Sequence, residues 1–185
     1  MSTQLFLRIP KERVGVLIGE KGKTKRQIEE LTQTKIEIED GSVTIKATEK
    51  TMDPLAPLKA KAIVMAIGRG FNPEKALRLL SDDVVLEIID INEFAHGSKN
   101  SLVRLKGRVI GEQGRTRKLI EELTGADISV YGHTVAIIGT PEEALVAKEA
   151  VIRLLEGAQH GSVYKYLYNK RREMKRARFG GWKRI

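Results

Sequence analysis

A segment of fifteen residues occurs twice in this chain of 185 residues. The first copy runs from Ile18 to Thr32 and the second from Ile110 to Thr124, an offset of 92 residues. Ten of the fifteen positions are identical, and three more exchange lysine for arginine. The offset persists downstream, where the aliphatic residues of the first copy are matched in the second: Ile36, Ile38, Val43 and Ile45 by Ile128, Val130, Val135 and Ile137. Because solenoid repeats have periods of only about 20 to 50 residues, the sequence predicts a duplicated domain.

Both copies show the same order of predicted elements. In the first, residue patterns predict a strand at 5–9, a short helix ending before Gly19, a second helix opened by the turn at 19–22, strands at 35–38 and 43–45, and a helix at 57–67. In the second, they predict a strand at 84–89, a helix at 102–109, the turn and its helix, two strands, and a helix at 141–155. Another short helix is expected at 73–80. The fold class is therefore α+β, with the order β-α-α-β-β-α in each copy.

The repeated turn has the pattern Gly-x-x-Gly in both copies. Its glycines lack a Cβ and let a sugar–phosphate backbone approach the main chain, and the helix that follows presents its amino-terminal amides there. Basic residues lie beside both turns, namely Lys21, Lys23, Lys25 and Arg26 in the first copy and Arg115, Arg117 and Lys118 in the second. The first variable position is acidic in both turns, as Glu20 and Glu112, and only the first turn has a compensating lysine. We therefore expect each turn alone to bind phosphate modestly.

Two helices joined by Gly-x-x-Gly, preceded by an aliphatic pair and followed by a β-hairpin, resemble the eukaryotic-type (type I) KH domain, in which three helices back a three-stranded sheet. The resemblance implies that each loop clamps single-stranded RNA while bases lie in an aliphatic groove near Ile36 and Ile38, or near Ile128 and Val130. The RNA-binding residues expected on this basis are Ile110, Gly111, Glu112, Gln113, Gly114, Arg115, Arg117, Lys118, Ile128 and Val130 first, then Gly19, Lys21, Gly22, Lys23, Lys25 and Arg26, with Arg171 and Arg172 of the tail.

Positive charge is concentrated at the end of the chain. Residues 161–185 hold nine Lys and Arg against one acid, a net charge of +8, whereas the whole chain has +9. This indicates a polyanionic partner. We expect a first KH domain at 1–70, a helical linker at 71–82, a second KH domain at 83–159 and a basic, partly helical tail at 160–185.

Two interpretations of the tail remain open, and both can hold for different residues. In one, an apolar stripe packs back on the protein; it comprises Val163, Leu167, Lys170 and Met174, with Tyr164 and Tyr168 alongside. In the other, aromatic residues interleaved with the basic ones stack on bases; these are Tyr164, Tyr166, Tyr168, Phe179 and Trp182.

Other function classes are disfavoured. A phosphate-binding Walker loop needs glycine where this chain has Leu17 and Val109. The adjacent pair Glu29-Glu30, like its second copy, cannot bracket a substrate from a helix. A DNA-binding helix-turn-helix lacks the hairpin that follows here twice. The three histidines are isolated and there is no cysteine, so we expect no metal, no cofactor and no enzymatic activity. No apolar stretch is long enough to span a membrane, and the expected location is cytoplasmic.

Two further segments narrow the resemblance. Residues 68–80 leading into Asp82-Asp83, and Leu154-Leu155-Glu156-Gly157 followed by 162–164, resemble the tandem KH small-subunit ribosome assembly factors known as partner-of-Nob, or the Dim family. The first loop keeps its glycines and a long amino-terminal extension is lacking, so the archaeal form is expected. The resemblance implies binding to the 3′ end of small-subunit ribosomal RNA, with the Nob endonuclease and pre-small-subunit particles as partners. The alternative is a protein-interaction scaffold in which one KH domain has lost RNA binding.

Overall fold

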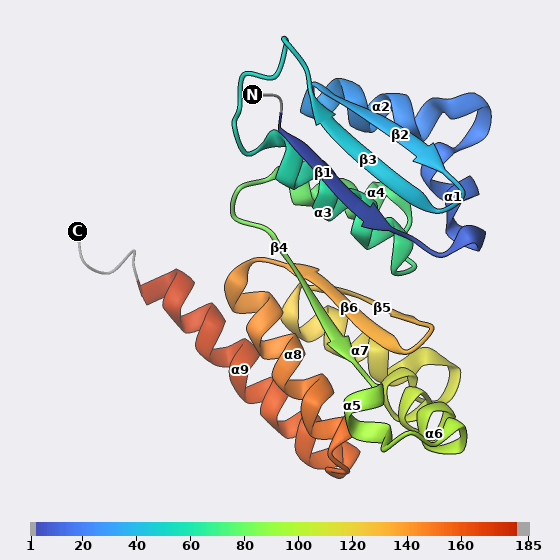
Figure 1. The fold of residues 1–185 in the computed structure, drawn as a ribbon. Coiled ribbons are helices and arrows are strands. Elements are labelled where there is room, and N and C mark those ends of the chain that lie inside the picture. Colours follow the sequence, from blue (N-terminus) through green and yellow to red (C-terminus); the bar gives the residue numbers. More distant parts are fainter. Residues whose placement is uncertain (1–2, 181–185) are drawn as a thin grey trace. The chain divides into compact units, whose positions relative to one another are not determined.

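The chain divides into two compact units, one ending at Leu86 and the next beginning at Glu87 (Figure 1). This computed structural model describes residues 3–180. Each unit contains a three-stranded sheet with helices against it, and both have the order β-α-α-β-β-α, so the predicted pair of type I KH domains is confirmed. No helix within residues 3–180 combines the length and apolarity needed to cross a membrane.

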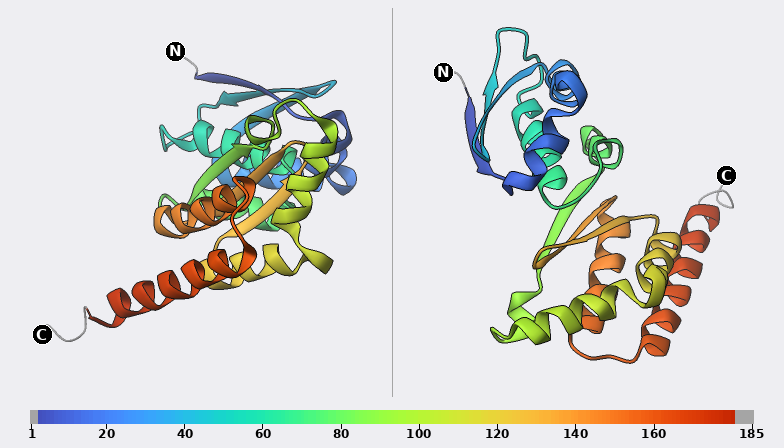
Figure 2. Two further views of the ribbon diagram at one scale, coloured as in Figure 1. Left: turned by 90° about the horizontal axis from the view of Figure 1, so that it is seen from below. Right: turned by 90° about the vertical axis from the view of Figure 1, so that its right-hand side faces the viewer.

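The first unit is a three-stranded sheet with helices packed on one face. Its elements are β1 (Gln4–Arg8), α1 (Lys11–Ile18), α2 (Lys23–Thr32), β2 (Thr34–Glu39), β3 (Ser42–Ala47) and α3 (Ala56–Gly68). The sheet order is β1-β3-β2, with β3 antiparallel to both neighbours. Alternation along β3 points Val43 and Ile45 inward, where each is 1% exposed or less, against the buried face of α3. All three long helices therefore cover one face of the sheet (Figure 2).

The segment after α3 packs on that helix. Two short helices follow it, α4 (Pro73–Ala76) and the 3₁₀ helix η2 (Leu77–Leu80), and both contact α3. The Asn72 side chain accepts a hydrogen bond from the Lys75 amide at 2.8 Å and begins α4, with Pro73 at its first position. The stretch expected as a linker therefore contributes residues 73–80 to the first unit.

The second unit repeats the plan and extends it. Its elements are β4 (Val85–Asp90), α5 (Asn92–Ala95), α6 (Lys99–Ile110), α7 (Arg115–Thr124), β5 (Asp127–Tyr131), β6 (Thr134–Gly139), α8 (Pro141–Leu155) and α9 (His160–Gly180). The sheet order is β4-β6-β5, and every residue of the central strand β6 is buried. The prediction missed α5 and started α6 three residues late. The Ser98 hydroxyl accepts from the Ser101 amide at 3.3 Å, so this cap sets the start of α6 at Lys99.

An arginine closes the last KH helix in both units. In the first, Arg13 of α1 donates to the carbonyls of Ile67 and Phe71, both at 2.8 Å. In the second, Arg108 of α6 donates to Leu154 at 2.8 Å and to Ala158. In each unit the guanidinium thus joins a carbonyl of the last helical turn to one in the segment that follows the helix, and it fixes the direction in which the chain leaves the helix.

Candidate nucleic-acid interface

The two Gly-x-x-Gly turns adopt the same backbone conformation. Gly19 has φ 73° and ψ 178°, and Gly111 has φ 74° and ψ 171°. The second variable residue is left-handed in both, with φ 52° at Lys21 and 56° at Gln113. The amide of the second glycine then donates to the carbonyl of the first, at 3.2 Å in one turn and 3.1 Å in the other. The duplicated sequence therefore specifies a duplicated turn, including its strained positions.

The two glycines of each turn have different roles. A Cβ on Gly19 would lie 2.9 Å from the Thr24 backbone nitrogen, and one on Gly111 would lie 2.8 Å from that of Thr116. Real Cβ atoms do not approach so closely, so the chain's own packing requires the first glycine. The second glycine has room for a Cβ, because the nearest heavy atom would be a side-chain atom at an ordinary contact distance of 3.9 Å. Only the second glycine leaves room for a ligand's backbone.

The helix that follows each turn begins without a side-chain cap. Gly22 and Gly114 are the N-caps of α2 and α7, and both are left-handed. Within the part of the chain that the structure describes, no side chain caps either helix and neither has an acidic residue in its first turn. The first turn of each helix therefore holds no carboxylate of its own, which favours an anion there, although Glu20 and Glu112 lie exposed in the preceding turns and oppose it.

The basic residues predicted around the turns, apart from Arg26, divide into two groups. Lys25 pairs with Glu29 at 3.4 Å and Arg117 pairs with Glu121, so these cations point along their own helices. Lys21, Lys23, Arg115 and Lys118 are exposed beside the turns.

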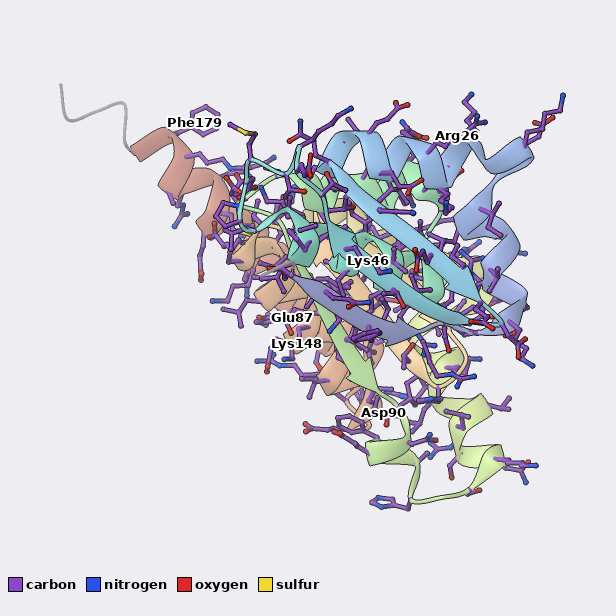
Figure 3. The ribbon with its side chains drawn as sticks, turned by 45° about the horizontal axis from the view of Figure 1, so that its top comes forward. Arg26, Lys46, Glu87, Asp90, Lys148 and Phe179 are labelled. Carbon is purple, nitrogen blue, oxygen red and sulfur yellow. The ribbon has the colours of Figure 1, made fainter. Side chains whose placement is uncertain are left out.

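Arg26 of α2, which is labelled in Figure 3, instead holds the first turn in shape. Its guanidinium donates to the carbonyl of Lys21 at 2.8 Å and to that of Gly22 at 3.3 Å. Because these bonds hold the guanidinium at the turn and the side chain is exposed, its positive charge is accessible beside the turn.

The aliphatic residues expected in the groove lie at different depths. Ile36 is 1% exposed and Ile128 is 3% exposed, so both belong to the core and support the groove from beneath. Ile38, Val130 and Ile110 are half-buried. Among the predicted groove residues, these three have the surface to touch a base.

The tail forms α9, and its packing interpretation is confirmed for three residues. Val163 and Leu167 are fully buried and Met174 is 9% exposed. Tyr166 lies against α8, with the Arg153 guanidinium 4.0 Å from its ring centre, and burial raises the pKa of the Tyr166 hydroxyl. Of the other predicted tail residues, Arg171 is half-buried, Arg172 is exposed, and Trp182 lies outside the described residues.

The sequence interpretation missed the group that ties α9 to the second turn. The Thr116 hydroxyl, behind Gly111, hydrogen bonds to the Tyr164 hydroxyl at 2.8 Å. The signal was available, because threonine occupies the corresponding position 24 in the first copy. A threonine retained in both copies marks the site against which the first glycine packs.

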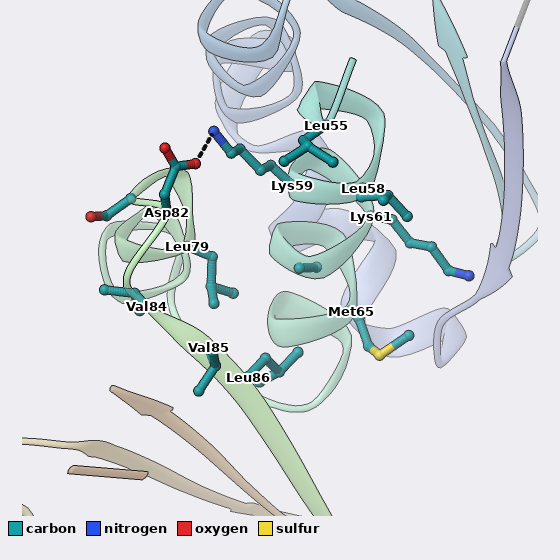
Figure 4. Close-up of a pocket in the computed structure, with 12 residues that line it drawn as sticks. Leu55, Leu58, Lys59, Lys61, Met65, Leu79, Asp82, Val84, Val85 and Leu86 are labelled. Atoms are coloured by element: carbon teal, nitrogen blue, oxygen red, sulfur yellow. Dashed lines mark ion pairs between the residues drawn. The ribbon is translucent and has the colours of Figure 1, made fainter. Parts of the chain in front are cut away.

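The first unit also has an apolar hollow of about 460 Å³ that contains no turn residue (Figure 4). Leu55, Leu58 and Met65 are among its lining residues, and Lys59 pairs at its edge with Asp82 at 2.6 Å. Hydrogen bonds to Asp82 and then Asp53 raise the pKa of the Lys59 ammonium. Within residues 3–180 there is no group of three His, Cys, Asp or Glu side chains that could hold a metal ion.

Comparison with known proteins gives consistent matches. The sequence profile of the eukaryotic-type KH domain (KH-domain type I) matches residues 85–172, and a KH domain profile matches residues 4–53. A KH domain-containing protein of Methanocaldococcus jannaschii is 59% identical over 97% of this chain and 79% of its own length.

Solved structures agree. The crystal structure of Dim2p from Pyrococcus horikoshii has a TM-score of 0.85 and 51% identity, covering 90% of this chain and 99% of that one. A chain in the a/eIF2alpha–aDim2p–rRNA complex from the same organism has a TM-score of 0.88 and 49% identity, covering 93% and 96%. A protein of unknown function from Aeropyrum pernix has a TM-score of 0.94 and 39% identity over both full chains.

Proposed function

Because this chain belongs to the tandem KH family that includes archaeal Dim2p, we propose that it binds single-stranded RNA through its Gly-x-x-Gly turns and acts by binding, not by catalysis. The observation that carries the proposal is the turn geometry. Both turns have an open second glycine, an uncapped helix start and exposed cations beside it. Such a site accepts a phosphate without selecting a base. The half-buried aliphatic residues nearby would then contact the bases.

The proposed target is the 3′ end region of small-subunit ribosomal RNA, during assembly of that subunit in the cytoplasm. A related aDim2p has been crystallised with rRNA, which supports ribosomal RNA as the ligand class. The family resemblance supports the 3′ end, with the Nob endonuclease and pre-small-subunit particles as partners. We assign the second turn the larger share of the contacts on the family resemblance alone, since exposed cations lie beside both turns.

Fluorescence anisotropy with a strand that matches the 3′ end tests the proposal. One variant combines Glu112→Asp with Gln113→Asp, and another combines Glu20→Asp with Lys21→Asp. Aspartate tolerates the left-handed conformation of positions 21 and 113, so the turn is kept while negative charge is placed where phosphate would lie.

The control is Gln159→Asp, which adds the same charge as Gln113→Asp at an exposed position outside the turn. We expect the second-turn variant to lose most of the affinity, the first-turn variant to lose less, and the control to bind like the unmodified protein. If neither turn variant loses affinity, the turns are not the RNA site.

A second candidate function is protein docking by the first unit. Leu31 of α2 is 52% exposed, whereas the corresponding Leu123 of α7 is 4% exposed in the second unit, where α9 packs on α7. The first unit thus exposes an apolar side chain that its duplicate covers. The salt dependence of binding separates the two functions. For a single strand held by about five phosphates, the logarithm of the binding constant falls with the logarithm of the salt concentration with a slope near −3.5, whereas binding of a protein by apolar contacts depends far less on salt.

A further inference from the structure

The outward face of α9 has a composition unlike its buried face. Opposite the buried Val163, Leu167 and Met174, six exposed side chains fall, with Gly161, within a sector of about 100° at the α-helical angle per residue. They are Lys165, Tyr168, Arg172, Lys175, Arg176 and Phe179, which we call the aromatic–basic stripe. The one acidic residue of the helix, Glu173, lies to the side and pairs with Lys170 at 3.2 Å.

The aromatic rings of the stripe differ from the other aromatic residues of α9. Tyr164 is hydrogen bonded to Thr116, and Tyr166 lies beneath Arg153. In contrast, Tyr168 is 48% exposed and Phe179 is 73% exposed, and Phe179 projects from the far end of the helix (Figure 3). Exposed rings among cations are what a protein uses to bind a single strand, because every base can stack on a ring and every phosphate attracts a cation.

The helix that carries the stripe packs against α7. Near its start α9 is joined to the first turn of α7 through Tyr164 and Thr116. Further along, Arg171, Met174, Lys175 and Arg178 line a hollow of about 200 Å³ together with Glu122–Gly125 at the end of α7. The two helices therefore run side by side in the same direction. Because α7 begins at the Gly-x-x-Gly turn and Lys175 of the stripe lines this hollow, a strand that continued from the turn along α7 would reach the edge of the stripe.

We propose that the aromatic–basic stripe of α9 is a second RNA-binding surface of the second unit. It stacks bases on Tyr168 and Phe179 and pairs phosphates with Arg172 and Arg176, for the same strand whose backbone the 111–114 turn holds. The inference rests on the proposed function of that turn. It extends the binding site beyond the KH groove and makes the affinity depend on strand length.

The test compares a strand of about 4 nucleotides, which fills one turn, with one of about 16 nucleotides. The variant combines Tyr168→Ala with Phe179→Ala, which changes no charge and removes two exposed side chains. The control combines Val103→Ala with Leu145→Ala, which are 70% and 68% exposed on other helices of the same unit.

We expect the alanine variant to lose at least about tenfold in affinity for the long strand and nothing for the short one. The control keeps both affinities. A variant that retains the rings, Tyr168→Phe with Phe179→Tyr, keeps the long-strand affinity. Replacing Arg172 and Arg176 by alanine lowers the log–log salt slope for the long strand by about 1.4.

Equal long-strand affinity of the alanine variant and the unmodified protein overturns the inference and leaves the stripe as a surface for a protein partner. The Glu112→Asp and Gln113→Asp variant distinguishes this failure from that of the proposed function. If the turn variant weakens both strands while the alanine variant weakens neither, only the stripe is refuted. If the alanine variant weakens the long strand and the turn variant weakens neither, the turn is refuted, and with it the single strand shared by turn and stripe; RNA contact by α9 alone is then what the data support.

Discussion

Replacing Gly111 by alanine should destabilise the second unit strongly. Its φ of 74° and ψ of 171° lie in a region that is essentially restricted to glycine, which costs about 1–3 kcal/mol for another residue. The new Cβ would also lie 2.8 Å from the Thr116 nitrogen, and overpacking of this kind costs about 1–3 kcal/mol more. The expected loss in the free energy of unfolding is about 2–6 kcal/mol.

Two other glycines separate these causes. Gly97→Ala measures backbone strain alone, because φ is 79° and no heavy atom lies within 4 Å of a Cβ there; we expect a loss of about 1–2 kcal/mol. Gly114→Ala should cost the same amount but also weaken RNA binding, because its methyl group occupies the open side of the turn.

The assay is urea denaturation followed by circular dichroism, with RNA anisotropy on the folded variants. A loss for Gly111→Ala no greater than that for Gly97→Ala would refute the packing role of the first glycine. Unchanged RNA affinity in Gly114→Ala would refute the assignment of the open side to the ligand.

Three further predictions concern stability of the second unit. Arg108→Ala removes two charged hydrogen bonds, to the carbonyls of Leu154 in α8 and of Ala158 after it, and should lower the free energy of unfolding by about 2–4 kcal/mol in urea denaturation. Arg108→Lys should recover less than half of this loss, because one ammonium cannot span both acceptors. Tyr164→Phe removes the hydrogen bond to Thr116 and should cost about 1 kcal/mol; an unchanged unfolding midpoint would contradict that bond. Hydrogen bonds from His133 and the Asn92 amide lower the pKa of Asp90 below its ordinary 3.8. The ionised Asp90 therefore stabilises the folded state fully above pH 3.8, and this stabilisation is lost as the pH falls through the lowered pKa. Asp90→Asn should remove this part of the pH dependence of the unfolding free energy, by less than about 1 kcal/mol because the side chains of Asp90 and His133 are both half exposed. The same pH dependence of the unfolding free energy in the variant and the unmodified protein would contradict it.

The repeated order of elements could be predicted because segments with the two-residue period of a strand alternate with segments that have the 3.6-residue period of a helix, in the same order in both copies. The turn geometry also follows from the sequence, since Gly-x-x-Gly recurs before helices with nearly identical residues. The i,i+4 spacing of Lys25 and Glu29, repeated by Arg117 and Glu121, was a readable signal that these cations pair within their own helices. For these two cations, the ion pair within the helix therefore decides where the side chain points, although both lie close to the turn in the sequence.

Other features depend on tertiary packing that spacing does not encode. Ile128 and Val130 share one face of β5, but the first lies over the core and the second near the strand end, so only the second is half exposed. The arginines that close α3 and α8 do not occupy equivalent positions of the repeat. Arg13 aligns with Leu105, and Arg108 lies about one helical turn further along, because α8 ends earlier in its copy than α3.

The most direct test of RNA binding by the turns is a backbone amide map, recorded by NMR while a single strand from the 3′ end of small-subunit ribosomal RNA is added. The account predicts the largest shifts at 111–115, smaller ones at 19–23, and, with a long strand, additional shifts along 165–179. Saturable binding of the strand with unshifted amides at both turns would contradict it, because the phosphates would then lie elsewhere on the protein.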